Sequence, residues 1–93
     1  MAVSVLIPTP LRALTAQQDT VTLEQPGTVA GLVDALARQF PGMGGRLRGD
    51  DGQLRRFINL YVNDEDIRFL QGADTPLKDG DQVSIVPAIA GGI

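Results

Sequence analysis

The chain has 93 residues, a formal net charge of −3 at pH 7, and neither cysteine nor histidine. This length allows one domain. The missing residue types exclude cysteine nucleophiles, histidine acid–base catalysis, zinc sites and iron–sulfur clusters. Basic stretches are short and interrupted, which argues against nucleic-acid binding. No apolar run approaches the ~20 residues that span a bilayer, so we expect a soluble, cytoplasmic protein without membrane contact.

The first part of the chain predicts a β-hairpin. Residues 2–7 are rich in strand-forming side chains and end at Pro8. Residues 20–24 alternate between threonine and an apolar residue, which places Val21 and Leu23 on one face. A polar loop at residues 15–18 lies between the two segments, so an antiparallel pairing is expected.

A helix about three turns long is predicted next. Thr28 has the side chain of an N-cap, and Pro41-Gly42 supplies a stop signal. One apolar stripe runs along the segment, formed by Val29, Leu32, Val33, Leu36 and Phe40. Residues 42–52 are rich in glycine and charge, so they are interpreted as an exposed, mobile loop.

The second half of the chain predicts further strands. Residues 57–63 alternate, with Ile58, Leu60 and Val62 on one face. Residues 63–66 predict a turn, and residues 67–69 a short strand that pairs after it. A tight turn at residues 78–81 leads to the last strand, residues 82–87, with Val83 and Ile85 facing inward.

The order β-β-α-β-β-β indicates an α+β fold, the ubiquitin-like β-grasp. A mixed sheet of about four or five strands would pack on one main helix. The first and last strands are expected to lie side by side and parallel in the centre of the sheet. We expect a β-grasp domain over residues 1–87 and a flexible Gly-Gly tail over residues 88–93.

The closing residues 79–92 follow the pattern G-D-x-V-x-I-x-P-x-x-A-G-G and resemble the C-terminus of ThiS/MoaD-type sulfur carriers. Residues 57–69 are similar to the same region of the CysO-type carriers of actinobacteria, and residues 5–12 agree with that branch. The resemblance therefore covers most of the chain, and it implies a carrier for cysteine biosynthesis.

The resemblance implies a protein that is not an enzyme and binds no cofactor. An E1-like adenylating enzyme would use ATP to activate Gly92, which then becomes a thiocarboxylate and donates sulfur. In the CysO-type branch the acceptor is an O-phosphoserine-dependent pyridoxal-phosphate synthase, and a JAMM-type metalloprotease releases cysteine. The same chemistry could serve thiamin, molybdopterin or a secondary metabolite. Two competing hypotheses are a ubiquitin-like modifier joined to lysines through Gly92 and a binding module with an inert tail.

The tail suits threading into a partner. Gly91 and Gly92 have no side chains, Ala90 has a small one, and all three could enter a narrow channel. Ile93 departs from the family pattern, because it places a branched residue and a further carboxylate beyond Gly92. We therefore expect a precursor from which Ile93 is removed; the competing interpretation is that Ile93 is harmless.

The open face of the sheet is the expected docking surface. Phe57, Tyr61 and Val86 should point away from the helix and contact the activating enzyme. The competing interpretation is ordinary packing between neighbouring strands. The acidic turn at residues 64–66 is interpreted as solvated, not as a magnesium site. Four arginines could aid recognition of acidic partners, although solvation is the simpler interpretation: Arg46, Arg48, Arg55 and Arg56.

Overall fold

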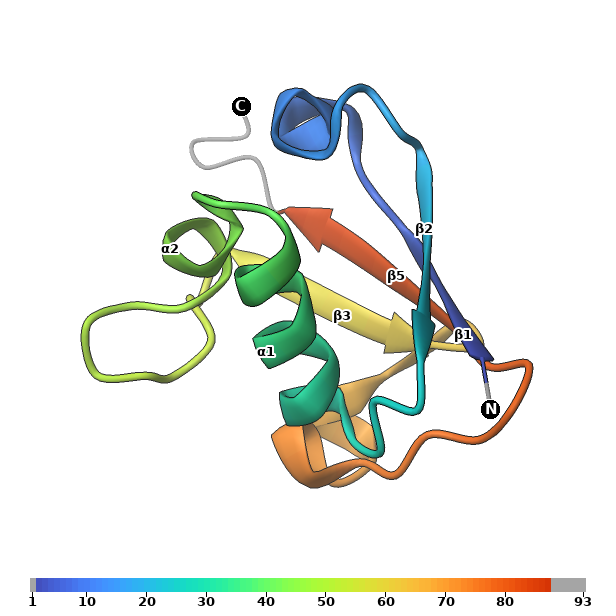
Figure 1. Cartoon of the computed structure of the whole chain (residues 1–93). Helices are drawn as coiled ribbons and strands as arrows, with labels where there is room; N and C mark the ends of the chain where they lie inside the picture. Colours follow the sequence, from blue (N-terminus) through green and yellow to red (C-terminus); the bar gives the residue numbers. More distant parts are fainter. Residues whose placement is uncertain (1, 88–93) are drawn as a thin grey trace.

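The computed structural model describes residues 2–87. One mixed sheet contains all five strands in the order β2-β1-β5-β3-β4, and α1 (Val29–Gln39) crosses one face of it (Figure 1). The strands are β1 (Ala2–Leu6), β2 (Thr20–Glu24), β3 (Ile58–Val62), β4 (Glu65–Asp66) and β5 (Gln82–Pro87). β1 pairs with β2 as the predicted antiparallel hairpin and with β5 in parallel at the centre of the sheet. The predicted α+β arrangement is confirmed.

The core lies between the sheet and α1. Each strand turns alternate side chains inward, and the helix presents one apolar stripe, so burial of both removes apolar surface from water. Phe40 is only partly buried at the end of the stripe. The inward strand residues and the helix stripe are almost fully buried: Val3, Val5, Val21, Leu23, Leu60, Val62, Val83 and Ile85 from the sheet, and Val29, Leu32, Val33 and Leu36 from α1.

The start of α1 is fixed by its predicted cap. The Thr28 hydroxyl oxygen accepts a hydrogen bond from the Gly31 amide at 3.1 Å, which satisfies a backbone donor that has no partner inside the helix. The chain before the cap passes so close to Gly31 that a β-carbon there would overlap the Pro26 carbonyl oxygen. This close approach requires glycine in the first turn of the helix.

The prediction of an exposed loop from residue 42 onward is wrong in its first half. Met43–Leu47 forms a second helix, α2, in which Met43 and Leu47 are fully buried. Gly42 has a φ of +94°, which lets the chain reverse directly after α1. The two buried side chains lie four residues apart on one face of α2, and they extend the core beyond α1. Residues 50–53 are exposed, as expected.

The predicted strand at residues 67–69 is also wrong. Ile67–Phe69 is a 3₁₀-helix, and the short strand β4 is Glu65–Asp66, two residues that were expected in the turn. The turn itself consists of Asn63 and Asp64, which have φ values of 50° and 73°. Positive φ at both positions is typical of the two-residue turns that match the twist of a hairpin.

Two further 3₁₀-helices, Thr9–Thr15 and Gly72–Asp74, occupy segments without a predicted element. Thr15, expected in a polar loop, is fully buried. Its hydroxyl donates to the Gln18 carbonyl oxygen at 2.9 Å, which offsets the burial of a polar group. None of the helices within residues 2–87 has the length and apolar character needed to cross a membrane.

Candidate functional site

The candidate site begins where β5 ends. β5 lies between β1 and β3, and its inward side chains Val83 and Ile85 are buried in the core. Its last residue, Pro87, pairs with Ile58 at the start of β3. β5 pairs with β1 over residues 82–84 and with β3 over residues 83–87, so pairing with β3 fixes the position from which the chain continues. The predicted tail residues lie outside the described residues, so their roles stay predictions: Ala90, Gly91, Gly92 and Ile93.

The sheet face opposite α1 carries the predicted docking residues. Tyr61 pairs with Ser84 across β3 and β5, and Ser84 pairs with Leu6 across β5 and β1, so these three lie in one row. Val86 lies one step nearer the end of β5, and its side chain is 42% exposed. Tyr61 is half-buried, and a shallow hollow on this face is lined by Tyr61, Ser84 and Val86.

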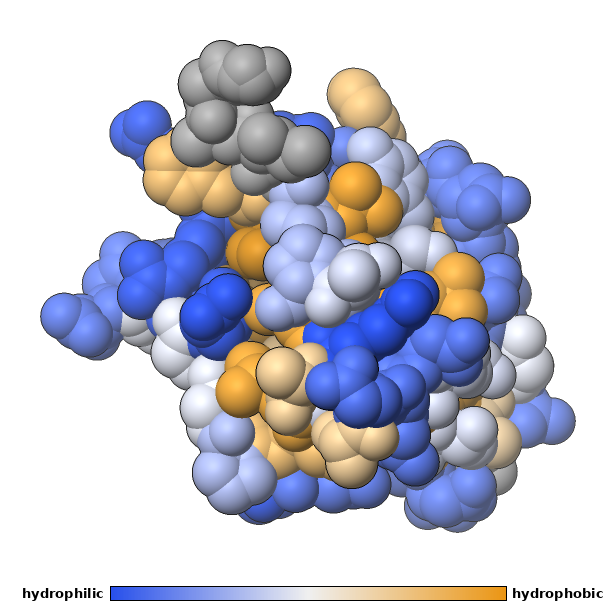
Figure 2. Space-filling model, turned by 90° about the horizontal axis from the view of Figure 1, so that it is seen from above, coloured by the Kyte–Doolittle hydropathy of each residue, from blue (hydrophilic) through white to orange (hydrophobic). Residues whose placement is uncertain are grey.

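Phe57 lies one residue before β3. Its neighbour Ile58 pairs with Pro87, the last residue of β5. It is 59% exposed, which is unusual for a large aromatic side chain. Figure 2 views the molecule from the end at which β5 finishes, and it shows apolar side chains reaching the surface between hydrophilic ones. The structure therefore places Phe57 and Val86 at the end of the sheet from which the chain continues towards Gly92.

Two residues that sequence reasoning missed fix the start of β5. The Asn63 side chain donates to Asp81 Oδ1 at 2.8 Å and accepts the Gln82 amide at 3.0 Å. Asp81 Oδ2 also accepts the Lys78 amide at 2.8 Å. The bond from the Lys78 backbone, followed by that from Asn63, lowers the pKa of Asp81 below its ordinary value of 3.8. These contacts join the turn that follows β3 to the turn that precedes β5.

The acidic segment after β3 serves the fold. Asp66 accepts hydrogen bonds from the amide and the guanidinium of Arg68, with 2.7 Å between Oδ2 and Nη2. The side-chain bond and then the backbone bond from Arg68 lower the pKa of Asp66. The Asp66 carboxylate thus caps the 3₁₀-helix Ile67–Phe69. Within the described part of the chain, acidic side chains form no group that could hold a metal ion.

The four arginines considered for partner recognition differ in their contacts. Arg48 forms an ion pair with Asp34 at 2.6 Å between Nη1 and Oδ1. The Arg55 Nε–H donates to the Gly45 carbonyl oxygen at 2.9 Å. Arg46 and Arg56 are exposed. Arg55 and Arg56 directly precede Phe57, so they lie near the end of β5, whereas Arg46 lies on α2.

Comparison with known proteins identifies the family. The sequence model of the ThiS family matches residues 5–92. The sulfur carrier protein CysO of Mycobacterium tuberculosis is 44% identical over 94 residues, covering 99% of this chain and 100% of that protein. The small archaeal modifier protein 3 of Haloferax volcanii is 34% identical over 70 residues, covering 75% of each chain.

Solved structures agree with the sequence matches. A crystal structure of the BexX/CysO complex of Amycolatopsis orientalis contains a chain that superposes with a TM-score of 0.87. That chain is 43% identical, and the match covers 97% of this chain and 99% of that one. The expected β-grasp fold and the resemblance to CysO-type sulfur carriers are confirmed, and this chain belongs to the ThiS family.

Proposed function

We propose that this protein is a sulfur carrier whose Gly92 carboxyl is adenylated by an E1-like enzyme and converted to a thiocarboxylate, after removal of Ile93. The observation that supports this most is the end-to-end similarity to CysO, at 44% identity over 99% of the chain. In this role the protein is a cosubstrate and not an enzyme. It works in the cytoplasm and binds no cofactor of its own, because the activating enzyme uses the ATP.

The chemistry needs no catalytic side chain on the carrier. A carboxylate is a poor acyl donor, so the E1-like enzyme first joins it to AMP with release of pyrophosphate. Sulfide then attacks the acyl carbon, AMP leaves, and the terminal carboxylate becomes a thiocarboxylate. Residues 88–92 reach at most roughly 17 Å when extended, enough to enter a partner's cleft. Glycine at positions 91 and 92 lets that segment pass through a narrow channel.

We propose cysteine formation as the use of this sulfur. The acceptor is a pyridoxal-phosphate synthase of the O-phosphoserine-dependent type, and a JAMM-type metalloprotease then releases cysteine from the carrier. Similarity to CysO supports this choice. The crystal structure of the Amycolatopsis orientalis complex contains CysO together with a second protein, BexX. Sulfur acceptors within thiamin, molybdopterin or secondary metabolism form the competing hypothesis.

Mass spectrometry tests the Gly92 proposal. The full-length chain and a variant ending at Gly92 are each incubated with ATP, sulfide and the E1-like enzyme of the same organism. We expect only the shorter chain to gain the mass difference between one sulfur and one oxygen atom. If the full-length chain gains it while retaining Ile93, removal of Ile93 is not required. If neither chain gains it, the carrier proposal is wrong.

The open face of the sheet is proposed to dock on the activating enzyme through Phe57, Tyr61 and Val86. Val86→Asp and Tyr61→Asp should each raise the KM of the carrier in adenylation roughly tenfold, because an apolar contact at the centre of an interface typically contributes more than about 1 kcal/mol. ATP–pyrophosphate exchange measures this. Thr22→Asp is the matched control, since Thr22 is exposed on the same face at the distant strand β2.

The result depends on the variants staying folded, which urea unfolding can establish. An unchanged KM for both folded variants would mean that these side chains only pack against their neighbours.

A ubiquitin-like modifier is the second candidate, favoured by the similarity to small archaeal modifier protein 3. In that case Gly92 would form isopeptide bonds with lysines of target proteins. Lys78 is the last tryptic cleavage site before Gly92, so tryptic target peptides that carry residues 79–92 on a lysine would reveal these bonds. Lys78 is the only lysine of the chain, so chains of the modifier could grow only there. If neither a thiocarboxylate nor adducts form and Gly92 is dispensable, the protein is a binding module with an inert tail.

A further inference from the structure

The two outer edges of the sheet differ in their surroundings. β2 forms one edge and has the acidic residues Asp19 and Glu24 at its ends. On the other side, β4 pairs only with Tyr61 and Val62 of β3. The first part of β3, from Ile58 to Leu60, therefore has no strand on its outer side within residues 2–87. An uncovered edge of this kind can pair with another chain.

The backbone of β3 offers a specific pair of groups at this edge. The Asn63 amide donates to the Gln82 carbonyl of β5, and the direction of backbone groups alternates along a strand. The odd-numbered residues of β3 therefore face β5, and the even-numbered ones face outward. The Ile58 amide already donates to the Arg55 carbonyl at 3.0 Å. The outward groups thus include the Leu60 N–H and the Ile58 C=O. One residue of an added parallel strand can bond these two groups together.

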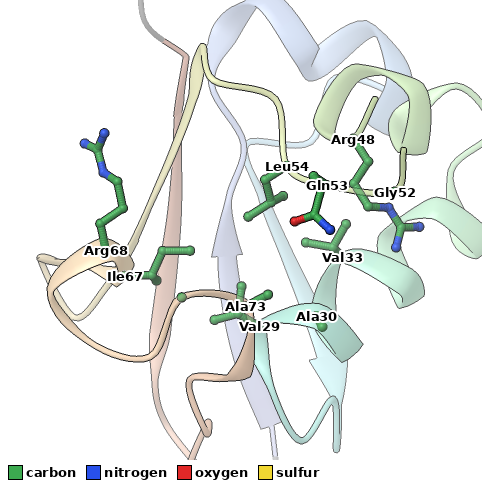
Figure 3. Close-up of a pocket in the computed structure, with 11 residues that line it drawn as sticks. Val29, Ala30, Val33, Arg48, Gly52, Gln53, Leu54, Ile67, Arg68 and Ala73 are labelled. Carbon is green, nitrogen blue, oxygen red and sulfur yellow. The ribbon is translucent and has the colours of Figure 1, made fainter. Parts of the chain in front are cut away.

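An apolar hollow lies beside this edge. A space of about 420 Å³ borders the outer side of β3 and is lined in part by Leu54, Leu60 and Ile67. It shares Leu54, Ile67 and Arg68 with a second space of about 310 Å³ against the first turn of α1. Figure 3 shows the residues that line this second space: the side chains of Leu54 and Ile67 lie on opposite sides of it, and the guanidinium of Arg68 points away from it. The hollow can accept an apolar side chain.

The rim of this hollow is positively charged, although the whole chain has a net charge of −3. Three arginines, Arg55, Arg56 and Arg68, line the space beside β3 together with one carboxylate, Asp66. Neither Arg55 nor Arg56 forms an ion pair within the described residues, whereas Arg48 and Arg68 are paired with Asp34 and Asp66. Carboxylates of a partner would complement the charges of Arg55 and Arg56.

We propose that the outer edge of β3 binds an acidic segment of a partner protein in extended conformation. The segment's backbone bonds the Ile58 carbonyl and the Leu60 amide, an apolar side chain enters the hollow beside Leu54, and flanking carboxylates meet Arg55 and Arg56. Backbone pairing supplies affinity, while the hollow and the arginines supply specificity. The surface lies along the outer edge of β3 and differs from the hollow on the open face that Tyr61, Ser84 and Val86 line.

An NMR titration tests this proposal with a synthetic nine-residue peptide, a Val-Leu-Val core flanked on each side by three glutamates. We expect shifts of backbone amides concentrated at residues 54–60 and 67, and few at β2. A peptide with lysines in place of the glutamates should bind at least fivefold more weakly, because a single exposed ion pair contributes up to about 1 kcal/mol. Shifts centred on β2 or on the open face would overturn the proposal.

Matched variants separate the contributions of charge and backbone. Arg56→Glu should weaken binding about fivefold at low salt. Arg46→Glu, an equal charge change at an exposed position of α2, should leave binding unchanged. Two further peptides carry N-methyl groups on alternate core amides. An added strand turns every second amide towards β3. Only the peptide whose methylated amides would face β3 should therefore lose binding.

Equal loss with both methylated peptides, or equal effects of Arg56→Glu and Arg46→Glu, would show general electrostatic attraction and overturn the proposal. Equal binding of the glutamate and lysine peptides would overturn the assigned partner chemistry.

Discussion

At the scale of single residues, Asp81 makes the stability of the fold sensitive to acid. Its folded-state pKa is lowered below 3.8, mainly by the hydrogen bond from the Lys78 backbone. The unfolded chain therefore binds the proton more readily than the folded one. The stabilisation from Asp81 is complete above the unfolded pKa and is lost as the pH falls through the lower folded pKa.

Urea unfolding from about pH 6 down to about pH 2.5 can measure this effect. The free energy of unfolding should fall less steeply below about pH 4 in Asp81→Asn than in the unmodified chain. Asp50→Asn, a change at an exposed carboxylate, is the control for the change in net charge. If the free energy of unfolding depends on pH in the same way in the original chain and in Asp81→Asn, Asp81 is not the source of the acid sensitivity.

Local signals predicted individual residues well when both partners were close in sequence. Thr28 was identified as a helix cap because its hydroxyl bonds an amide three residues later. The Asn63–Asp81 hydrogen bond joins residues 18 positions apart, and each residue by itself indicates only a turn. The exposure of Phe57 and Val86 agrees with the predicted placement on the open face, while their docking role stays a prediction.

At the scale of secondary-structure elements, two glycines in the two helices should respond in opposite ways to alanine. Alanine normally stabilises a helix relative to glycine by about 1 kcal/mol. Gly31→Ala should nevertheless destabilise the protein, because the β-carbon would overlap the Pro26 carbonyl oxygen. Gly45→Ala in α2 has no atom within 4 Å of the new β-carbon and should stabilise by roughly 0.5–1 kcal/mol. Urea unfolding of both variants checks this pair, and a gain in both would disprove the close approach at Gly31.

Short elements were the ones that the sequence could not predict. α2 has five residues and two glycines, so Met43 and Leu47 give a single apolar pair and no repeating stripe. β4 has only two residues, both acidic, and its pairing is set by the two-residue turn before it. The longer elements, such as α1 and β5, were predicted because each shows a full period of apolar positions.

At the scale of the whole molecule, the strand order predicts which backbone amides exchange their hydrogens most slowly. β1 and β5 each have a hydrogen-bonded strand on both sides, whereas β2 has one neighbour. Amide hydrogen exchange followed by NMR should therefore be slowest in β1 and β5, at rates set by global unfolding, and faster in β2 through local opening. Equal rates in β2 and β5 would indicate that the sheet opens only as a unit.

The arrangement of the whole fold was predictable because few topologies suit its order of elements. A hairpin, one long amphipathic helix and returning strands bury a common core when the first and last strands lie together. The predicted residues of the C-terminal tail lie beyond Pro87. The structure therefore describes the strand that precedes them, β5, and does not test their roles.

The parallel pairing of β1 and β5 also has a mechanical consequence. Ala2 lies at one end of this pair of strands and Pro87 at the other. Tension applied between the two would slide the strands along each other, so that all the hydrogen bonds between them share the load at once. Strands pulled apart from one end would instead lose these bonds one after another. A pull on the C-terminal side of β5, against a hold on the N-terminal side of β1, therefore loads these hydrogen bonds together and not one at a time.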